Sequence, residues 1–173
     1  MSVDLSRYVR DVPDFPKPGV VFKDLTPLLA DARAFAASID ALVAPFADKR
    51  IERIVGIEAR GFIFGAAAAH ALGAGFVPMR KPRKLPAKTI GVDYALEYGS
   101  DRLEMHADAL VRDERVLVVD DVLATGGTLA AAATLCAQAG ANVVGAAVVA
   151  EIAFLNGRRR WSREAPLHAV LRF

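Results

Sequence analysis

What the chain lacks already excludes several classes of protein. It contains a single cysteine, so it cannot form an internal disulfide, and we expect a reducing, cytoplasmic setting. We expect this residue, Cys136, to be a buried structural thiol because it lies in an alanine-rich, helix-like stretch. The three histidines, His70, His106 and His168, are isolated in sequence and lack the spacing of a zinc site. We therefore expect no metal held by the protein itself.

Long apolar runs and a strong charge bias are missing as well. No uninterrupted apolar run could span a bilayer, and the N-terminal residues lack the apolar stretch of a signal peptide. The formal net charge is only +2, and basic residues gather at 80–84 and 158–160. Neither group alternates with aromatic residues as nucleic-acid stacking sites do. We expect no membrane or nucleic-acid partner, a small anionic ligand at 80–84, and a solvated helix end at 158–160.

What is present is an alternation of apolar strands and helices. Apolar residues make up 54% of the chain, which excludes a disordered protein, and 173 residues predict a single domain, 1–173. The alternation predicts an α/β fold with a central parallel sheet flanked by helices. Asp31 is the expected start of one helix, and Gly73 and Gly140 are the expected ends of two others. We expect helices at 31–46, 61–72 and 126–139, and strands at 51–57, 76–79, 116–119, 143–150 and 168–173.

Residues 116–129, VLVVDDVLATGGTL, are the most informative segment. An apolar strand ends at Asp120 and Asp121 and turns through a Thr-Gly-Gly-Thr loop into a helix. Backbone N–H groups at a helix start bind phosphate, and the carboxylates can accept hydrogen bonds from sugar hydroxyls. Neither GxxxxGK[ST] nor GxGxxG is present. The segment predicts a site for a phosphorylated sugar, with an ordinary strand–turn–helix as the alternative.

The alternation is interrupted between the expected strands at 76–79 and 116–119. Residues 80–88 are basic and contain proline, and 89–105 resemble two short strands around a Tyr-Gly-Ser turn. Excursions of this length in compact domains usually serve function, often as a lid. The alternative is a hairpin that only packs on the sheet.

The phosphate segment resembles the motif with which type I phosphoribosyltransferases bind 5-phosphoribosyl-1-pyrophosphate (PRPP). Three further segments resemble the adenine-specific members of that family: DFPKPGVVFKD at 14–24, GIEARGF at 56–62 and YALEYG at 94–99. They appear in the family's order, and with 80–86 the similarity covers nearly the whole chain. Enzymes for 6-oxopurines carry aspartate where this chain has Ala124, and uracil enzymes carry proline at the Asp121 position.

The resemblance implies the type I phosphoribosyltransferase fold, with a small N-terminal hood at about 1–30 and a flexible catalytic lid at about 80–106. It implies a pentosyltransferase that converts adenine and PRPP to AMP and pyrophosphate in purine salvage. Mg²⁺ would arrive with PRPP, because this ion typically binds through substrate phosphates and water. The arginine at the Arg80 position can reach a neighbouring subunit's site in the family, which implies a homodimer.

Each site residue implied by the resemblance also has suitable chemistry. Glu97 would act on N7 of the purine as the catalytic carboxylate, with Tyr98 closing the site and Glu104 as the rival acid. The family commonly has serine at the Ala59 position, so one hydroxyl is absent here. The adenine site would be Val21, Phe22 and Lys23; the pyrophosphate site Glu58, Ala59, Arg60, Arg80, Lys81 and Lys84; and the ribose phosphate site Asp120, Asp121, Ala124, Thr125, Gly126, Gly127 and Thr128.

Two other functions stay open on the sequence. One is a phosphoribosyltransferase for xanthine or guanine, against which Ala124 and the segment 21–23 argue. The other is a PRPP-sensing regulator that binds nucleic acid without catalysis. Glu97 and the basic lid favour turnover, and we expect no DNA-binding module before Asp14, because few residues precede it.

Overall fold

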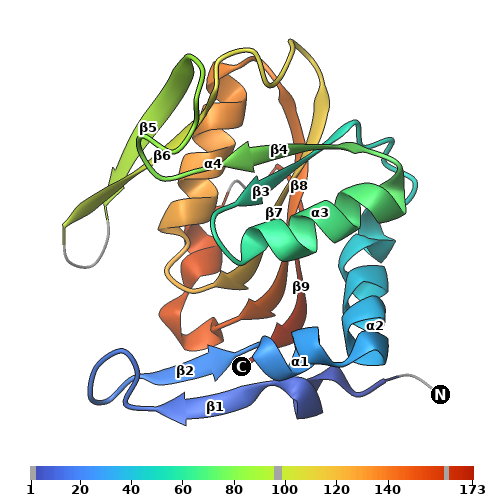
Figure 1. Cartoon of the computed structure of the whole chain (residues 1–173), viewed down its shortest axis with the longest axis vertical. Helices are drawn as coiled ribbons and strands as arrows, with labels where there is room; N and C mark the ends of the chain where they lie inside the picture. Colours follow the sequence, from blue (N-terminus) through green and yellow to red (C-terminus); the bar gives the residue numbers. More distant parts are fainter. Residues whose placement is uncertain (1–2, 96–98, 162–163) are drawn as a thin grey trace.

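A computed structural model describes residues 3–95, 99–161 and 164–173 (Figure 1). Its centre is a five-stranded sheet with the order β4-β3-β7-β8-β9, in which every neighbouring pair is parallel. The predicted α/β class and parallel sheet are confirmed. The strands are β3 (Arg53–Ile57), β4 (Gly75–Met79), β7 (Arg115–Leu123), β8 (Asn142–Glu151) and β9 (Leu167–Arg172).

Strand β7 is longer than the sequence predicts. It continues past Val119 because its pairing with β8 extends to Val122 opposite Ala150 and Leu123 opposite Glu151. Asp120 and Asp121 therefore lie within the strand, near its carboxyl end, rather than after it. The strand holds both carboxylates in an extended, fixed backbone.

Helices cover both faces of the sheet (Figure 1). They are α1 (Thr26–Ala30), α2 (Ala32–Val43), α3 (Gly61–Leu72) and α4 (Gly127–Gln138). Successive strand side chains point to opposite faces. Along β7, Leu117 and Val119 pack with α2 and α3, whereas Val116 and Val118 pack with α4. The sheet thus divides the core into two apolar halves.

The predicted helix boundaries have clear local causes. Helix α2 begins after Asp31, whose Oδ1 accepts hydrogen bonds from the N–H groups of Arg33 at 3.0 Å and Ala34 at 2.8 Å. The chain then continues into a 3-10 turn, Ala44–Phe46, at the end of the predicted helix. Helix α3 ends at Gly73, which adopts φ +64°, a left-handed conformation that glycine tolerates best.

The N-terminal region forms a hairpin that periodicity did not predict. Strands β1 (Arg10–Pro13) and β2 (Val21–Asp24) pair antiparallel, preceded by a 3-10 turn, Leu5–Tyr8. Each strand has only four residues. Leu5 is buried in the same half of the core as α2 and α3, so the hairpin is anchored from its N-terminal side.

The expected excursion is a second hairpin. Strands β5 (Thr89–Ala95) and β6 (Ser100–His106) pair antiparallel and lie beside α4 (Figure 1). Leu103 and Met105 of β6 are fully buried in the α4 half of the core. The base of the hairpin therefore packs firmly, and whether the hairpin acts as a lid stays a prediction. Residues 96–98 at its turn, which include Glu97 and Tyr98, lie outside the described residues.

Two expectations about cysteine and arginine positions are confirmed. Cys136 is buried in α4, as expected, and burial raises the pKa of its thiol to about 12. Residues 158–160 are exposed and end a 3-10 turn, Gly157–Arg160, as expected of a solvated helix end. Arg158 also pairs with the buried Glu151, at 2.6 Å from Nη2 to Oε2.

Within the described residues, no helix is both long and apolar enough to cross a membrane.

The capping contact of α2 leads to a test of stability. Asp31→Ala removes an acceptor from two backbone N–H groups, so we expect the free energy of unfolding to fall by about 1 kcal/mol. Urea denaturation at neutral pH measures this change. Asp31→Asn keeps an acceptor oxygen and is the matched control. Equal unfolding midpoints for Asp31→Ala and the wild type would contradict the capping role.

Candidate active site

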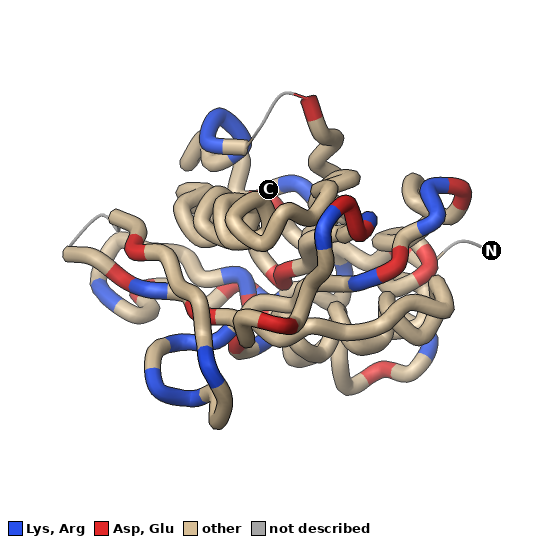
Figure 2. Tube along the Cα trace, turned by 90° about the horizontal axis from the view of Figure 1, so that it is seen from above, with Lys and Arg blue, Asp and Glu red and all other residues tan. Residues whose placement is uncertain are grey.

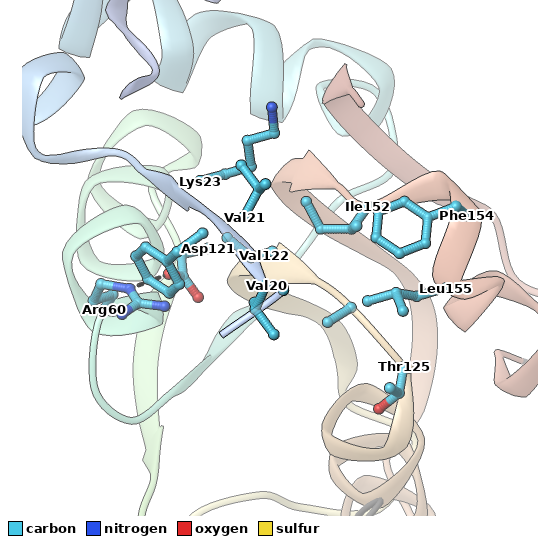
Figure 3. Close-up of a pocket in the computed structure, with 13 residues that line it drawn as sticks. Val20, Val21, Lys23, Arg60, Asp121, Val122, Thr125, Ile152, Phe154 and Leu155 are labelled. Carbon is cyan, nitrogen blue, oxygen red and sulfur yellow. Dashed lines mark hydrogen bonds and ion pairs between the residues drawn. The ribbon is translucent and has the colours of Figure 1, made fainter. Parts of the chain in front are cut away.

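A cavity of about 430 Å³ lies at the carboxyl ends of β7 and β8 (Figure 3). Ligands of parallel α/β sheets bind at this edge. Arg60 and Asp121 lie on one side of the cavity, and Ile152, Phe154 and Leu155 on the other. Strand β2 supplies further lining from 21–23, and the loop after β7 supplies Ala124 and Thr125. The cavity therefore brings together the predicted base and sugar segments.

The paired acids of β7 have different surroundings. Asp120 is buried, and its Oδ1 accepts a hydrogen bond from the Asp121 N–H at 2.9 Å. Burial, followed by the neighbouring Asp121 charge, raises the pKa of Asp120 well above its usual range. Asp121 faces the cavity and forms an ion pair with Arg60 Nε. Asp121 is thus the carboxylate that a ligand in the cavity can contact.

The loop after β7 surrounds a smaller cavity of about 60 Å³. Asp120, Ala124, Thr125, Gly126 and Thr128 are among the residues that line it. Gly126 adopts φ +82°, which lets the backbone turn sharply into α4. A helix start of this kind offers unpaired N–H groups to an anion. Five of the seven predicted ribose phosphate residues line this small cavity, whereas Asp121 lines the large cavity and Gly127 is in neither lining.

The predicted base segment lines the large cavity from β2. The Phe22 ring stacks edge-on with Phe15 at 5.2 Å between centroids, and the Arg60 guanidinium lies 5.3 Å from the Phe22 centroid. The Lys23 amine pairs with Asp11 at 2.6 Å, and its side chain points away from the cavity in Figure 3. The charged end of Lys23 therefore lies outside the cavity, although the residue lines it.

The other predicted pyrophosphate residues meet at the end of β3. Glu58 accepts hydrogen bonds from Lys84 Nζ at 2.7 Å, Lys81 N at 2.9 Å and Arg80 Nη2 at 3.2 Å. Burial opposes the charge of Glu58, but these donors outweigh it and lower its pKa to about 2. The peptide bond between Glu58 and Ala59 is cis. Arg80 Nε is buried without a hydrogen-bond partner among the described residues.

Lys81 has partners in the hairpin that sequence reasoning missed. Its Nζ forms an ion pair with Asp101 and lies 2.9 Å from the Tyr94 hydroxyl. Burial opposes the charge of Lys81, yet the hydrogen bonds with Asp101 and Tyr94 raise its pKa above the ordinary value. Figure 2 shows Lys and Arg interleaved with Asp and Glu along the trace. The predicted cations Arg60, Arg80, Lys81 and Lys84 are therefore all paired with carboxylates.

Sequence reasoning also missed the segment after β8. Ile152, Phe154 and Leu155 line the large cavity, and Phe154 is 77% exposed. Its place directly after an apolar strand could have pointed to it, because the chain that leaves a buried parallel strand enters the ligand-binding edge of the sheet. No group of three or more His, Cys, Asp or Glu side chains in the described part of the chain is arranged to hold a metal ion.

Comparison with known families agrees with this geometry. Residues 22–168 match the family described as Phosphoribosyl transferase domain, so the chain belongs to the phosphoribosyltransferases. An adenine phosphoribosyltransferase of Xanthomonas axonopodis pv. citri (strain 306) is 57% identical over 95% of this chain and 89% of its own length. An adenine phosphoribosyltransferase of Solidesulfovibrio magneticus (strain ATCC 700980 / DSM 13731 / RS-1) is 57% identical over 91% of this chain and 92% of its own length. Within the family, the chain is a member of the adenine phosphoribosyltransferases.

Solved structures show the same relationship. The crystal structure of adenine phosphoribosyltransferase from Rhodothermus marinus DSM 4252 has a TM-score of 0.94 and 49% identity, covering 98% of this chain and 96% of that one. The enzyme from Saccharomyces cerevisiae, complexed with D-2,5-dideoxy-2,5-imino-altritol 1,6-bisphosphate and adenine, has a TM-score of 0.91 and 40% identity, covering 97% of both chains. The likeness extends over the whole fold.

The low pKa of Glu58 makes its contribution to stability dependent on pH. Its folded-state pKa of about 2 lies below the ordinary 4.5, so the ion pairs stabilise the fold above pH 4.5. This contribution is lost as the pH falls toward 2. We expect Glu58→Gln to be less stable than the wild type near neutral pH, with the difference shrinking below about pH 4.5. Denaturant unfolding over a pH series measures the difference.

A matched control for that series is Asp48→Asn. Asp48 is 80% exposed, and its nearest ion-pair distance, to Lys49 Nζ, is 3.6 Å. Exposed pairs of this kind contribute little to stability. We expect the Asp48 variant to follow the wild type across the series. A Glu58→Gln difference that stays constant with pH would contradict the ion-pair assignment.

Proposed function

We propose that the protein transfers the 5-phosphoribosyl group of PRPP to N9 of adenine and releases AMP and pyrophosphate. The observation that carries the proposal is the shared cavity, in which Phe22 of β2 lies near Asp121 and the loop after β7. The membership of the adenine phosphoribosyltransferases supports the same reaction. The yeast relative, whose structure contains adenine and a bisphosphate, supports a paired base and phosphate site.

For the sugar phosphate, the loop 124–128 would bind the 5-phosphate through backbone N–H groups and the Thr125 and Thr128 hydroxyls. Asp121 would accept hydrogen bonds from the ribose hydroxyls, because it faces the cavity. Asp120, which is buried, would keep the Asp121 backbone in position by accepting the hydrogen bond from its N–H. Arg60 would exchange Asp121 for the pyrophosphate, since a phosphate group offers a guanidinium two strong acceptors.

For the base, the Phe22 ring would stack on adenine, an interaction worth about 1–3 kcal/mol for bases on aromatic side chains. Backbone groups of Val21 and Lys23 would contact the N6 and N1 edge. A site that accepts a hydrogen bond from the 6-amino group leaves a 6-oxo base with unmatched polar groups. Such mismatches discriminate strongly between substrates.

For the chemistry, C1′ would develop oxocarbenium character as its bond to pyrophosphate breaks and N9 attacks. Glu97 would hydrogen-bond the N7 proton of the reactive adenine tautomer and accept it as N9 attacks, so that the neutral base of AMP is formed, and Tyr98 would help to close the site. Arg80, Lys81 and Lys84 would balance the charge on the departing pyrophosphate. Mg²⁺ carried by PRPP through its own oxygens would add positive charge there, and a cation held in this way needs no protein cage.

Two further expectations stay predictions. The homodimer rests on the resemblance at the Arg80 position, and in this structure Arg80 hydrogen-bonds Glu58 and the Lys84 carbonyl of its own chain. The cytoplasmic setting rests on the single cysteine.

The first experiment measures pyrophosphate release with PRPP, Mg²⁺ and each of adenine, hypoxanthine, guanine, xanthine and uracil. We expect release with adenine alone. Release with a 6-oxopurine would keep PRPP as substrate and overturn the adenine site. Binding of PRPP without release from any base would overturn catalysis and favour a PRPP sensor.

Replacement of Glu97 tests the catalytic role. Glu97→Gln cannot manage the N7 proton, so we expect turnover to fall by about 100-fold or more, the usual scale for a general acid or base. PRPP affinity should stay within about twofold, because Glu97 would act on the base. Steady-state kinetics and PRPP titration measure the two effects. Glu104→Gln is the matched control, and a loss of turnover there but not in Glu97→Gln would transfer the role to Glu104.

A further inference from the structure

The segment that follows β8 contacts both parts of the cavity, yet neither the sequence motifs nor the proposed reaction assigns it a role. Its first half, with the 3-10 turn Ala153–Leu155, lines the base side. Its second half, the 3-10 turn Gly157–Arg160, packs against the loop after β7. The segment is therefore placed to set the shape of the phosphate loop.

The contact between the second turn and the phosphate loop is backbone against backbone. A Cβ on Gly157 would stand 2.1 Å from the Ala124 carbonyl oxygen and 2.8 Å from Gly126 N. Conversely, a Cβ on Gly126 would stand 2.1 Å from the Gly157 carbonyl oxygen. Real Cβ atoms essentially never approach other atoms below 3.0 Å. Only glycine fits at either position without a backbone shift.

This close approach bears on the orientation of one peptide group in the phosphate loop. The Ala124 carbonyl oxygen is the nearest atom to the missing Gly157 side chain. In a planar trans peptide, the C=O and the following N–H point in opposite directions. A carbonyl held toward Gly157 therefore turns the Thr125 N–H away from it. Thr125 also lines the small cavity, where an anion would use that donor.

An ion pair with a buried carboxylate anchors the residue that follows Gly157. The next residue, Arg158, donates from Nε and Nη2 to both carboxylate oxygens of Glu151 at 3.1 and 2.6 Å. Its Nη1 donates to the Leu167 carbonyl at 2.6 Å. Glu151 is 2% exposed, and Arg158 holds its pKa below the ordinary value. Bidentate pairs of this kind fix geometry as well as charge.

The same turn brings a cation to the start of α4. Arg160 Nη1 lies 3.3 Å from the point where a Cβ on Gly127 would stand. A positive charge at a helix start is unfavourable unless an anion balances it. This placement suits a loop that holds a phosphate.

We propose that Gly157 is a positioning residue for the 5-phosphate: it lets the turn 157–160 pack against the loop and hold the Ala124–Thr125 peptide with its N–H toward the phosphate. Glu151 and Arg158 keep Gly157 at that distance. The inference rests on the proposed function, because the phosphate is that of PRPP or AMP.

The test compares the affinities of AMP and adenosine, which differ only in the 5-phosphate. A variant that lowers the fraction of folded, binding-competent protein weakens the binding of both ligands equally. The ratio of the AMP affinity to the adenosine affinity therefore reports the phosphate contact alone. Gly157→Ala must push the loop backbone away. We expect it to lower the ratio by about tenfold, the scale of one lost hydrogen bond to a charged group. Calorimetric titration measures both affinities.

Gly145→Ala is the matched control for crowding. Its Cβ would stand 2.6 Å from Phe46 Cε1 and 2.8 Å from the Pro166 carbonyl oxygen, toward the amino end of β8 and away from the loop. We expect the ratio of this variant to equal that of the wild type. An unchanged ratio in Gly157→Ala, or an equal fall in Gly145→Ala, would overturn the inference.

If Gly157→Ala does not fold, Arg158→Gln tests the same inference. It removes the charge that fixes the turn, and we expect the ratio to fall by about threefold or more. A ratio within error of the wild type would overturn the inference. Wild-type protein that binds PRPP but releases no pyrophosphate with adenine would instead refute the proposed function, so the two failures are distinguishable.

Discussion

The site depends on the parallel pairing of β7 with β3 on one side and β8 on the other. A central strand that is buried on both faces has little freedom to shift, because its backbone groups are paired and its side chains are packed. Its carboxyl end therefore positions Asp120 and Asp121, and then the loop 124–128, with fixed geometry. Strand β3 delivers Glu58 and Arg60 to the same edge, and β8 delivers the segment 152–160. The three strands determine where each ligand group can lie.

Charge balance is the second organising feature. The cations proposed for pyrophosphate are paired with carboxylates: Arg60 with Asp121, Lys81 with Asp101, and Lys84 with Glu58. These pairs avoid leaving unbalanced charges in a partly buried site. In the proposed reaction, binding of pyrophosphate would therefore exchange one acidic partner of these cations for another.

Much of this could be predicted from the sequence, because local signals and the fold agree. Asp31 caps α2, Gly73 ends α3, and the apolar runs became the central strands. The hairpin β1–β2 was missed because its strands have four residues each, too few to show a period. The ion pair of Arg158 could not be predicted because its partner, Glu151, lies on another element. The pairing of Lys81 with Tyr94 and Asp101 likewise depends on tertiary contacts that the sequence does not display. The roles of Glu97 and Tyr98 stay predictions.

The division of the core into two halves also separates the supports of the two hairpins. The N-terminal hairpin is anchored through Leu5 in the half that contains α2 and α3, whereas the β5–β6 hairpin is anchored through Leu103 and Met105 in the half that contains α4. The sheet lies between these anchors, so each hairpin packs in its own half of the core. In the proposed reaction, the hairpin beside the base and the hairpin beside the pyrophosphate are therefore supported by separate sets of core side chains.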